Sequence, residues 1–196
     1  MLLNKTPLYR IAIFASGTGS NADKIISYFK SSDSISIALI VSNNREAGVL
    51  HIANKNNIPT LILEKEKFFL KDVYLPVFES YKINFIVLAG FLWKIPLNLI
   101  KAFPQKIINI HPALLPAYGG KGMYGMHVHE AVIAHKEKQS GITIHYVDEL
   151  YDHGKIIFQE KCAVDKNETP ASLATKIHRL EYAHFAPQIE KLLLFK

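Results

Sequence analysis

The sequence predicts an α/β fold built on a doubly wound, mostly parallel sheet, and three observations lead to this prediction. In the first half of the chain, short runs of β-branched and aromatic residues alternate with helix-length segments, as in consecutive βα units. The run Phe85–Ala89 is apolar throughout, as expected of a strand covered on both faces. In the second half, Gly141–Val147 alternates apolar and polar residues, and we expect it to pair with Lys155–Ala163 as an antiparallel addition near the C-terminus.

The individual elements follow from this pattern in chain order. The strands expected in the first half are Tyr9–Ala15, Ser36–Val41, Thr60–Leu63, Phe85–Ala89 and Lys106–Ile110, with helices between them at Ala22–Phe29, Ala47–Asn56, Phe68–Tyr81 and Leu97–Ala102. Asn21 is the expected N-cap of the first of these helices. Further helices are expected at His129–His135 and from Thr169-Pro170 to about Leu194, where the proline suits a first helical turn. Without repeats or a linker, residues 1–196 are expected to form a single domain.

Composition limits the class of protein. The chain has 196 residues, 49% hydrophobic and 20% charged, which is ordinary for a globular domain with a real core. No apolar run approaches the roughly 18 residues of a membrane span, and the first residues lack a signal-peptide pattern. Cys162 is the single cysteine, and we expect it to be structural rather than reactive. These features predict a cytoplasmic protein without a membrane partner.

The net charge of +6 suggests an anionic partner. The lysines are scattered, and no basic run interleaved with aromatic residues resembles a surface for stacking nucleic-acid bases. The charge therefore favours a small anionic substrate and not a nucleic acid.

A glycine-rich turn, Ser16-Gly17-Thr18-Gly19-Ser20-Asn21, lies between the first strand and the first helix. Glycines allow close approach of the backbone to a phosphate, and the amides at a helix start supply donors. The spacing also fits a dinucleotide site, but residues 41–44 lack the acid that would bind the ribose. A monophosphate is the favoured ligand, and a tight turn without a ligand remains the alternative.

The motif Asn109-Ile110-His111-Pro112 closes an apolar run, and Asp152 follows in a later loop. If the run is a strand, Asn109 and His111 project from the same side at its end. An amide and a protonated imidazole can donate to the oxygen that becomes negative when a carbonyl is attacked. A carboxylate such as Asp152 raises the histidine pKa and can relay the proton of an attacking amine. Strand-end capping without catalysis remains open from spacing alone.

Three further groups have both a structural and a functional interpretation. His127-Val128-His129 could be a metal pair, but no third ligand is evident, so we expect helix-start packing and no metal. Glu181 is either a solvated residue of the terminal helix or a ligand for sugar hydroxyls, and its spacing favours solvation. Phe91 and Trp93 are expected to belong mainly to the core, although the glycine at the strand end, Gly90, can open room for a flat ring.

The ordered set of motifs resembles the phosphoribosylglycinamide formyltransferases of the folate-dependent formyltransferase superfamily. The resemblance rests on the glycine-rich turn, Leu88-Ala89-Gly90-Phe91, the run Asn109-Ile110-His111-Pro112-Ala113-Leu114-Leu115-Pro116, and His145 followed by Asp152. It extends from Ile11 to about Pro187. It implies a Rossmann-like fold and transfer of formyl from 10-formyltetrahydrofolate to the amine of glycinamide ribonucleotide.

The resemblance also implies roles for particular residues. Asn109, His111 and Asp152 would be catalytic, and Gly19, Ser20, Asn21, His178 and Glu181 would bind glycinamide ribonucleotide. The folate would contact Lys71, Leu92, Trp93, Lys94, Ile95, Asn109, Asp148, Glu149, Leu150, Tyr151 and Asp152. The chain departs from the family in having Lys71, after a shorter connection, in place of a folate-binding arginine. Trp93 and Lys94 stand where smaller or differently ordered residues are frequent, and the loop over residues 118–125 is longer than in some members.

Three other functions are weighed against this one. A formyltetrahydrofolate deformylase shares the Asn, His and Asp residues but usually carries an N-terminal regulatory domain, for which the strand expected from Tyr9 leaves no room. A methionyl-tRNA formyltransferase needs a C-terminal RNA-binding barrel, which is not expected in a chain ending at Lys196. A nucleotide-binding module without catalysis would explain the glycine-rich turn but leave Asn109, His111 and Asp152 without a role.

Overall fold

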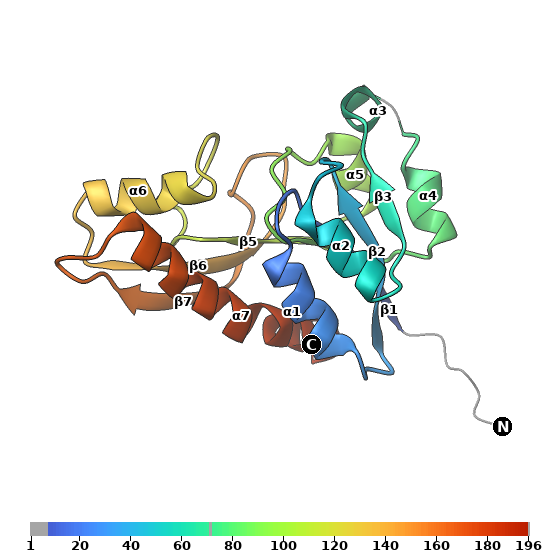
Figure 1. Ribbon diagram of the computed structural model, residues 1–196. Coiled ribbons are helices and arrows are strands. Elements are labelled where there is room, and N and C mark those ends of the chain that lie inside the picture. The colour runs from blue at the N-terminus through green and yellow to red at the C-terminus, as the bar shows by residue number, and fades with distance from the viewer. Residues whose placement is uncertain (1–7, 71, 196) are drawn as a thin grey trace. The chain divides into compact units, whose positions relative to one another are not determined.

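The computed structural model describes residues 8–70 and 72–195. The chain falls into two compact units, one ending at Ile107 and the other beginning at Ile108 (Figure 1). Within the described residues, none of the helices combines the length and the apolar character needed to cross a membrane. The expected single domain over residues 1–196 stays a prediction.

The first unit contains four parallel strands in the order β3-β2-β1-β4. They are β1 (Tyr9–Phe14), β2 (Ile35–Ser42), β3 (Thr60–Ile62) and β4 (Phe85–Leu88). β4 is buried along its whole length, as its apolar sequence predicts for a strand covered on both faces. The four predicted strands of this region are therefore confirmed to within one or two residues at each end.

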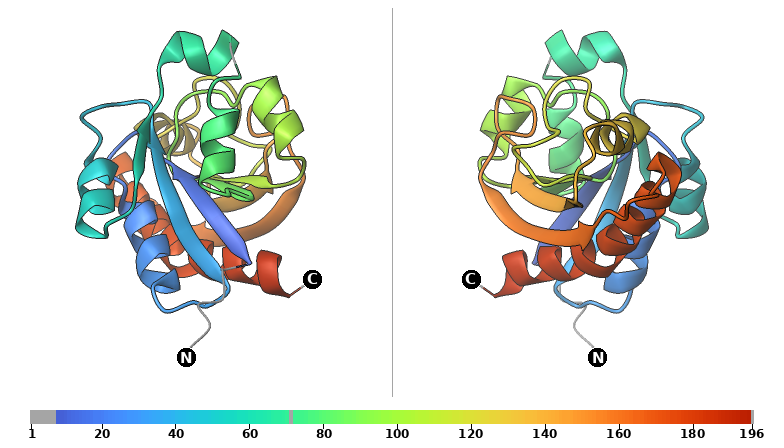
Figure 2. Two further views of the ribbon diagram at one scale, coloured as in Figure 1. Left: turned by 90° about the vertical axis from the view of Figure 1, so that its right-hand side faces the viewer. Right: turned by 90° about the vertical axis from the view of Figure 1, so that its left-hand side faces the viewer.

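Helices cover both faces of this parallel sheet (Figure 2). α1 (Ser20–Phe29) and α2 (Gly48–Lys55) lie on one face, and α4 (Leu75–Ser80) and α5 (Leu97–Ala102) lie on the other. Phe14 of β1 contacts Phe78 and Phe91, with ring centroids 5.8 and 5.3 Å away. Phe91 is thus part of the core, as the sequence predicts.

The single helix predicted over Phe68–Tyr81 is wrong. The structure has α3 (Lys65–Leu70) and α4 (Leu75–Ser80), with residues 72–74 outside both helices. Pro76 lies in the first turn of α4. In a continuous helix its ring would clash with the carbonyl of residue 72 and its nitrogen could donate no hydrogen bond, so the proline fits a helix start.

The helix starts also differ from expectation. α1 begins at Ser20, and its N-cap is Gly19 instead of Asn21 because Gly19 takes a left-handed conformation with φ 80°. α6 (Met126–Ala134) begins three residues before the predicted His129. Each helix therefore begins within the glycine-containing segment that precedes the predicted helix.

The second unit contains an antiparallel sheet in the order β5-β6-β7. β5 (Ile107–His111) belongs to this unit except for its first residue, Ile107. β6 (Gln139–Tyr146) and β7 (Ile156–Ala163) follow it in the chain. The long helix α7 (Pro170–Leu194) packs against β6, β7 and α6 (Figure 1). It starts as predicted, with the Thr169 side chain accepting from the Ser172 N–H and Pro170 in the first turn.

Candidate active site

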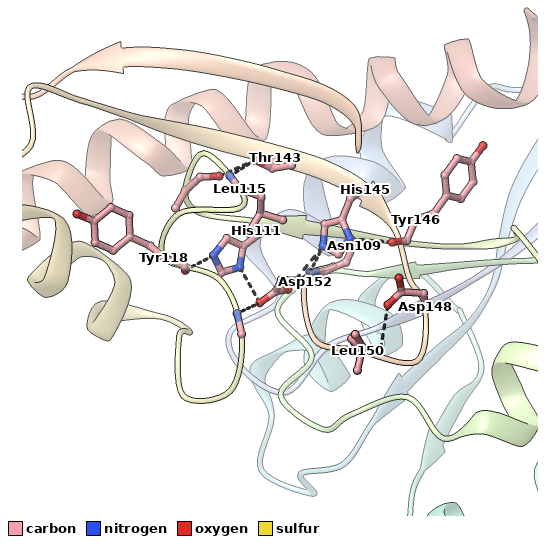
Figure 3. A network of polar contacts seen from close by, with 12 residues as sticks. Asn109, His111, Leu115, Tyr118, Thr143, His145, Tyr146, Asp148, Leu150 and Asp152 are labelled. Atoms are coloured by element: carbon pink, nitrogen blue, oxygen red, sulfur yellow. Dashed lines mark hydrogen bonds and ion pairs between the residues drawn. The ribbon is translucent and has the colours of Figure 1, made fainter. Parts of the chain in front are cut away.

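The pairing of β5 with β6 brings four polar side chains together in the second unit. Asn109 is paired with His145, and His111 is paired with Thr143. Alternate residues of a strand face the same side, so Asn109 and His111 project together from β5. Figure 3 shows the side chains of Asn109, His111 and His145 converging on Asp152, whereas Thr143 lies beside Leu115.

Asp152 reaches this cluster from the loop that follows β6. Its backbone is left-handed, with φ 54°, a conformation that aspartate tolerates better than most residues. One carboxylate oxygen lies 3.6 Å from Nδ1 of His111 and accepts the Gly120 N–H at 2.9 Å. The other lies 3.5 Å from Nδ2 of Asn109. The three side chains singled out from the sequence therefore lie in one place, within one unit.

The tautomer of His111 follows from its hydrogen bonds. Nε2 lies 2.7 Å from the carbonyl oxygen of Tyr118. A carbonyl only accepts hydrogen bonds, so Nε2 must carry a proton. The nitrogen that gains or loses a proton is then Nδ1, which faces Asp152.

The direction of the His111 pKa corrects one expectation. Burial of the ring is the largest influence and lowers the pKa, whereas the charge of Asp152 and the Tyr118 carbonyl raise it. Asp152 thus acts in the expected direction, but burial outweighs it and the net pKa lies below the usual 6.5. At neutral pH the ring is neutral, with Nδ1 as a proton acceptor.

Asp152 stays ionised in this environment. Burial is the largest single influence and raises its pKa. Its interactions with His145, His111 and the Gly120 N–H together lower the pKa by more, so the net value lies below the usual 3.8. The site therefore pairs a carboxylate with a neutral imidazole.

His145 orients the amide of Asn109. Nδ1 of His145 lies 2.8 Å from the Tyr146 carbonyl, so Nδ1 carries the proton and Nε2 accepts. Nδ2 of Asn109 lies 3.1 Å from this Nε2 and donates one hydrogen to it. The second hydrogen points towards Asp152 at the longer distance of 3.5 Å and is available to a substrate oxygen.

Thr143 fixes the chain that follows His111. Its buried hydroxyl donates to the Ala113 carbonyl at 2.7 Å and accepts the Leu115 N–H at 3.0 Å. Gln159 of β7 donates to the Leu115 carbonyl at 3.0 Å. The sequence analysis missed Thr143, Tyr118 and Gly120. Thr143 could have been found from the sequence, because it lies two residues before His145 and so on the same face of the predicted strand.

The residues expected to bind glycinamide ribonucleotide fall in both units. Gly19, Ser20 and Asn21 form the start of α1 in the first unit. An added Cβ on Gly19 would lie 2.6 Å from the Cβ of Val49, so the turn packs tightly against α2.

His178 and Glu181 lie on α7 in the second unit. Glu181 is only 6% exposed, so the solvated position favoured from its spacing is wrong. The exposed ring is that of His178, which stacks on Tyr182 with centroids 6.1 Å apart. Glu181 lies four residues from the buried Ile177 and Phe185, so it belongs to the buried face of α7.

The residues expected to contact folate also fall in both units. After β4, Leu92 is 50% exposed and Trp93 is half-buried against Phe68 and Phe69, whereas Ile95 is buried. Lys94, also expected to contact folate, is exposed, and Lys71 lies outside the described residues.

The expected folate residues of the second unit form the loop before Asp152. Leu150 and Tyr151 are 58% and 43% exposed, and Glu149 is exposed beside them. Asp148 accepts the Leu150 N–H at 2.9 Å, which gives the loop an internal turn. These side chains are therefore accessible, whereas Asn109 and Asp152 are more enclosed.

The two histidines considered as a metal pair have different surroundings. His127 is exposed and stacks on Tyr124 with centroids 5.2 Å apart, whereas His129 is buried. Burial, followed by the charges of His178 and His111, lowers the pKa of His129 to about 4. Among the described residues, no group of three or more His, Cys, Asp or Glu side chains could hold a metal ion.

An α/β fold with an amide, an imidazole and a carboxylate gathered beside a strand end suits acyl-group transfer. Comparison with known families agrees: residues 9–189 match the family described as formyl transferase, and the chain belongs to this family. Several of the relatives share one name. Phosphoribosylglycinamide formyltransferase of Bacillus subtilis is 34% identical over 94% of both chains.

A chloroplastic phosphoribosylglycinamide formyltransferase of Arabidopsis thaliana is 42% identical over 88% of this chain. This chain spans only 61% of that relative, and 60% of a second chloroplastic one from Vigna unguiculata. The crystal structure of phosphoribosylglycinamide formyltransferase from Bacillus halodurans superimposes with a TM-score of 0.85 at 34% identity, covering 95% of this chain and 96% of that one. The predicted fold class, a mostly parallel sheet with antiparallel strands at its C-terminal end, is thereby confirmed.

Proposed function

We propose that this chain transfers the formyl group of 10-formyltetrahydrofolate to the amine of glycinamide ribonucleotide. The observation that carries the proposal is the gathering of Asn109, His111 and Asp152 beside the end of β5, with Asp152 3.6 Å from Nδ1 of His111. The name phosphoribosylglycinamide formyltransferase, which several relatives carry, supports the choice of the acceptor and of the transferred group. The donor is the one that the resemblance in sequence implies. Both are small molecules, and the amine carries a phosphate.

Asn109 stabilises the oxygen that becomes negative when the amine attacks the formyl carbon. His145 holds one hydrogen of the Asn109 amide, so the second hydrogen has a fixed direction before the substrate arrives. A donor that needs no reorganisation is worth more in a buried site than in water. The loss of such a donor typically slows turnover by about 10²–10³-fold.

His111 and Asp152 move the proton. The attacking nitrogen must lose one proton, and the departing N10 of tetrahydrofolate must gain one. Neutral His111 accepts the proton at Nδ1, directly or through a water, and the imidazolium formed is stabilised by the Asp152 carboxylate beside it. The same Nδ1–H then donates towards the oxyanion and returns the proton to N10, so the overall transfer is balanced. The lowered pKa of His111 suits this role because it leaves Nδ1 unprotonated at neutral pH.

Gly19, Ser20 and Asn21 would bind the substrate phosphate through the amides at the start of α1. His178 and Glu181 would bind the ribose and glycinamide end, and the low exposure of Glu181 favours a specific hydrogen bond over solvation. Leu92, Trp93, Lys94 and Ile95 would lie along the folate, together with the loop residues 148–152. Lys71 is the residue assigned to the folate glutamate.

We place the reaction in the cytoplasm because the single cysteine suits a reducing compartment, although two relatives are named chloroplastic. No nucleic acid, membrane or metal is required by the chemistry above. The relevant partners are the two substrates.

One assay tests the proposal. The purified chain is mixed with 10-formyltetrahydrofolate, with and without glycinamide ribonucleotide, and the release of tetrahydrofolate is followed. We expect release only when the amine is present, with a stoichiometric formylated product. Release that needs no amine would instead identify a deformylase, and no release under either condition would indicate a binding module.

A further inference from the structure

One short backbone segment holds both members of the His111–Asp152 pair. The Tyr118 carbonyl accepts from Nε2 of His111 at 2.7 Å, and the Gly120 N–H donates to Asp152 at 2.9 Å. Between them, an added Cβ on Gly119 would lie 2.5 Å from Leu115 and 3.2 Å from the Cβ of Asp152. The path of residues 118–120 therefore sets the position of both groups.

Tyr118 holds this path in an unfavourable conformation. Its φ is 57°, in the left-handed region that bulky residues rarely adopt. A strained backbone persists only when its surroundings fix it. The Tyr118 side chain points away from the His111–Asp152 pair (Figure 3). Its contacts with other residues can therefore stabilise this backbone conformation.

The Tyr118 side chain is bound to the turn that follows α6. Its hydroxyl donates to Oε1 of Glu137 at 2.7 Å, and its ring lies 5.7 Å from that of His135. The turn is itself attached to the helix, because the Glu137 N–H donates to the Val132 carbonyl at 3.2 Å. Burial and Glu137 raise the pKa of Tyr118 to about 12, so the phenol keeps its donor hydrogen at all working pH values.

We propose that Tyr118 and Glu137 are positioning residues for His111. Their bond holds the Tyr118 carbonyl against Nε2, which keeps the proton on that nitrogen and leaves Nδ1 facing Asp152. The catalytic meaning of this arrangement rests on the function proposed above, but the arrangement itself does not. Without the bond, Tyr118 can relax out of its left-handed conformation and its carbonyl can turn away.

The test compares Tyr118→Phe and Glu137→Ala, neither of which can form the bond, with Glu130→Ala, a control on the exposed side of α6. The ring nitrogens of His111 are followed by ¹⁵N NMR across pH and assigned by their loss in His111→Gln. The wild type should show the Nε2–H tautomer. Both test variants should show a mixture of tautomers and a lower His111 pKa, because the Tyr118 carbonyl raises that pKa. Asp152, His145 and His129 are the other titratable groups acting on or beside this ring and are unchanged in both variants.

Kinetics provide the second measurement. Each test variant should lower the single-turnover rate about tenfold, the effect of one hydrogen bond, with little change in KM. The acidic limb of the pH profile should move to lower pH, and the double variant should be no slower than either single one. Glu130→Ala should match the wild type.

Unchanged His111 nitrogen signals in both test variants would overturn the proposal, even if activity falls. Should Tyr118→Phe fail to fold, Glu137→Ala decides alone, because Glu137 is exposed. A wild type that transfers no formyl group would refute the proposed function, while the NMR comparison would still decide the positioning role.

Discussion

The glycine-rich turn of the first unit and the β5–β6 cluster of the second unit differ in the chemical groups that they present to a ligand. The turn presents backbone amides, and its shape depends on Gly19 at φ 80° packed against Val49. The cluster presents side chains, and its shape depends on hydrogen bonds that fix the Asn109 amide and the His111 tautomer.

This difference determines which kinds of substitution disrupt each region. A backbone site is disrupted by a change of packing or conformation, which affects stability and binding together. A side-chain site is disrupted by a change of charge or of one hydrogen bond, which affects the rate while the fold remains. Substitutions in the turn should therefore change KM and stability, whereas substitutions in the cluster should change kcat.

The largest effect is expected from Asp152→Asn. The amide oxygen can still accept the Gly120 N–H, and asparagine tolerates a φ of 54°, so the fold should remain. The charge that stabilises the His111 imidazolium is lost, and the single-turnover rate should fall by at least about 10³-fold. Rapid-quench measurement of formyl transfer checks this result. Asp165→Asn, which breaks an exposed ion pair with Lys176, should leave the rate unchanged, and near-normal turnover in Asp152→Asn would remove that residue from the mechanism.

Gly19→Ala should mainly affect stability and substrate binding. The new Cβ would lie 2.6 Å from Val49, and alanine is strained at φ 80°. We expect a loss of about 2–4 kcal/mol in the free energy of unfolding and a higher KM for the ribonucleotide. Urea denaturation measures the first quantity. Gly17→Ala is the matched control, since no atom lies within 4 Å of its added Cβ, and equal losses in both variants would contradict the packing argument.

His145→Asn should affect the rate and hardly the binding. Asn109 loses the acceptor that fixes its amide, so its free hydrogen no longer has one direction. We expect kcat to fall about 10–100-fold, the equivalent of ~1–3 kcal/mol, with KM nearly unchanged. Steady-state kinetics of this variant and of the exposed His51→Asn make the comparison. A rise in KM without a fall in kcat would assign His145 to substrate binding.

The smallest expected effect is a dependence of stability on pH. The folded pKa of His129 is about 4, below its ordinary 6.5, so the unfolded chain binds more protons between these values. The stabilisation is present above pH 6.5 and is lost as the pH falls to about 4. After allowance for solvent screening, the loss is on the order of 1–2 kcal/mol.

Denaturation of the wild type and of His129→Gln across this range measures the difference in slope. The variant should retain a shallower slope, because the pKa of His111 is lowered as well. Equal slopes in the two proteins would show that His129 does not titrate as inferred.

The sequence predicted the parallel strands, the antiparallel addition and the long helix α7 because their hydrophobic periods are regular. It missed the break between α3 and α4, where the steric requirement of Pro76 outweighs helical periodicity. It also predicted a solvated Glu181, although this residue lies four positions from the buried Ile177 and Phe185 and therefore on the buried face of the helix.

Within the candidate site, Asn109, His111 and Asp152 could be selected by their chemistry. The roles of Tyr118 and Gly120 could not, because they act through a backbone carbonyl and amide that any residue possesses. The neutral state of His111 was missed for a related reason. A neighbouring carboxylate is visible in a sequence, whereas the extent of burial that outweighs it is not.

Asn109, His111, His145 and Asp152 all follow Ile108 in the chain, so their mutual geometry is internal to one unit. If the glycine-rich turn binds the substrate phosphate as proposed, binding and chemistry depend on residues of different units. Selection could adjust capture and chemistry in separate steps, each through residues that the other does not use.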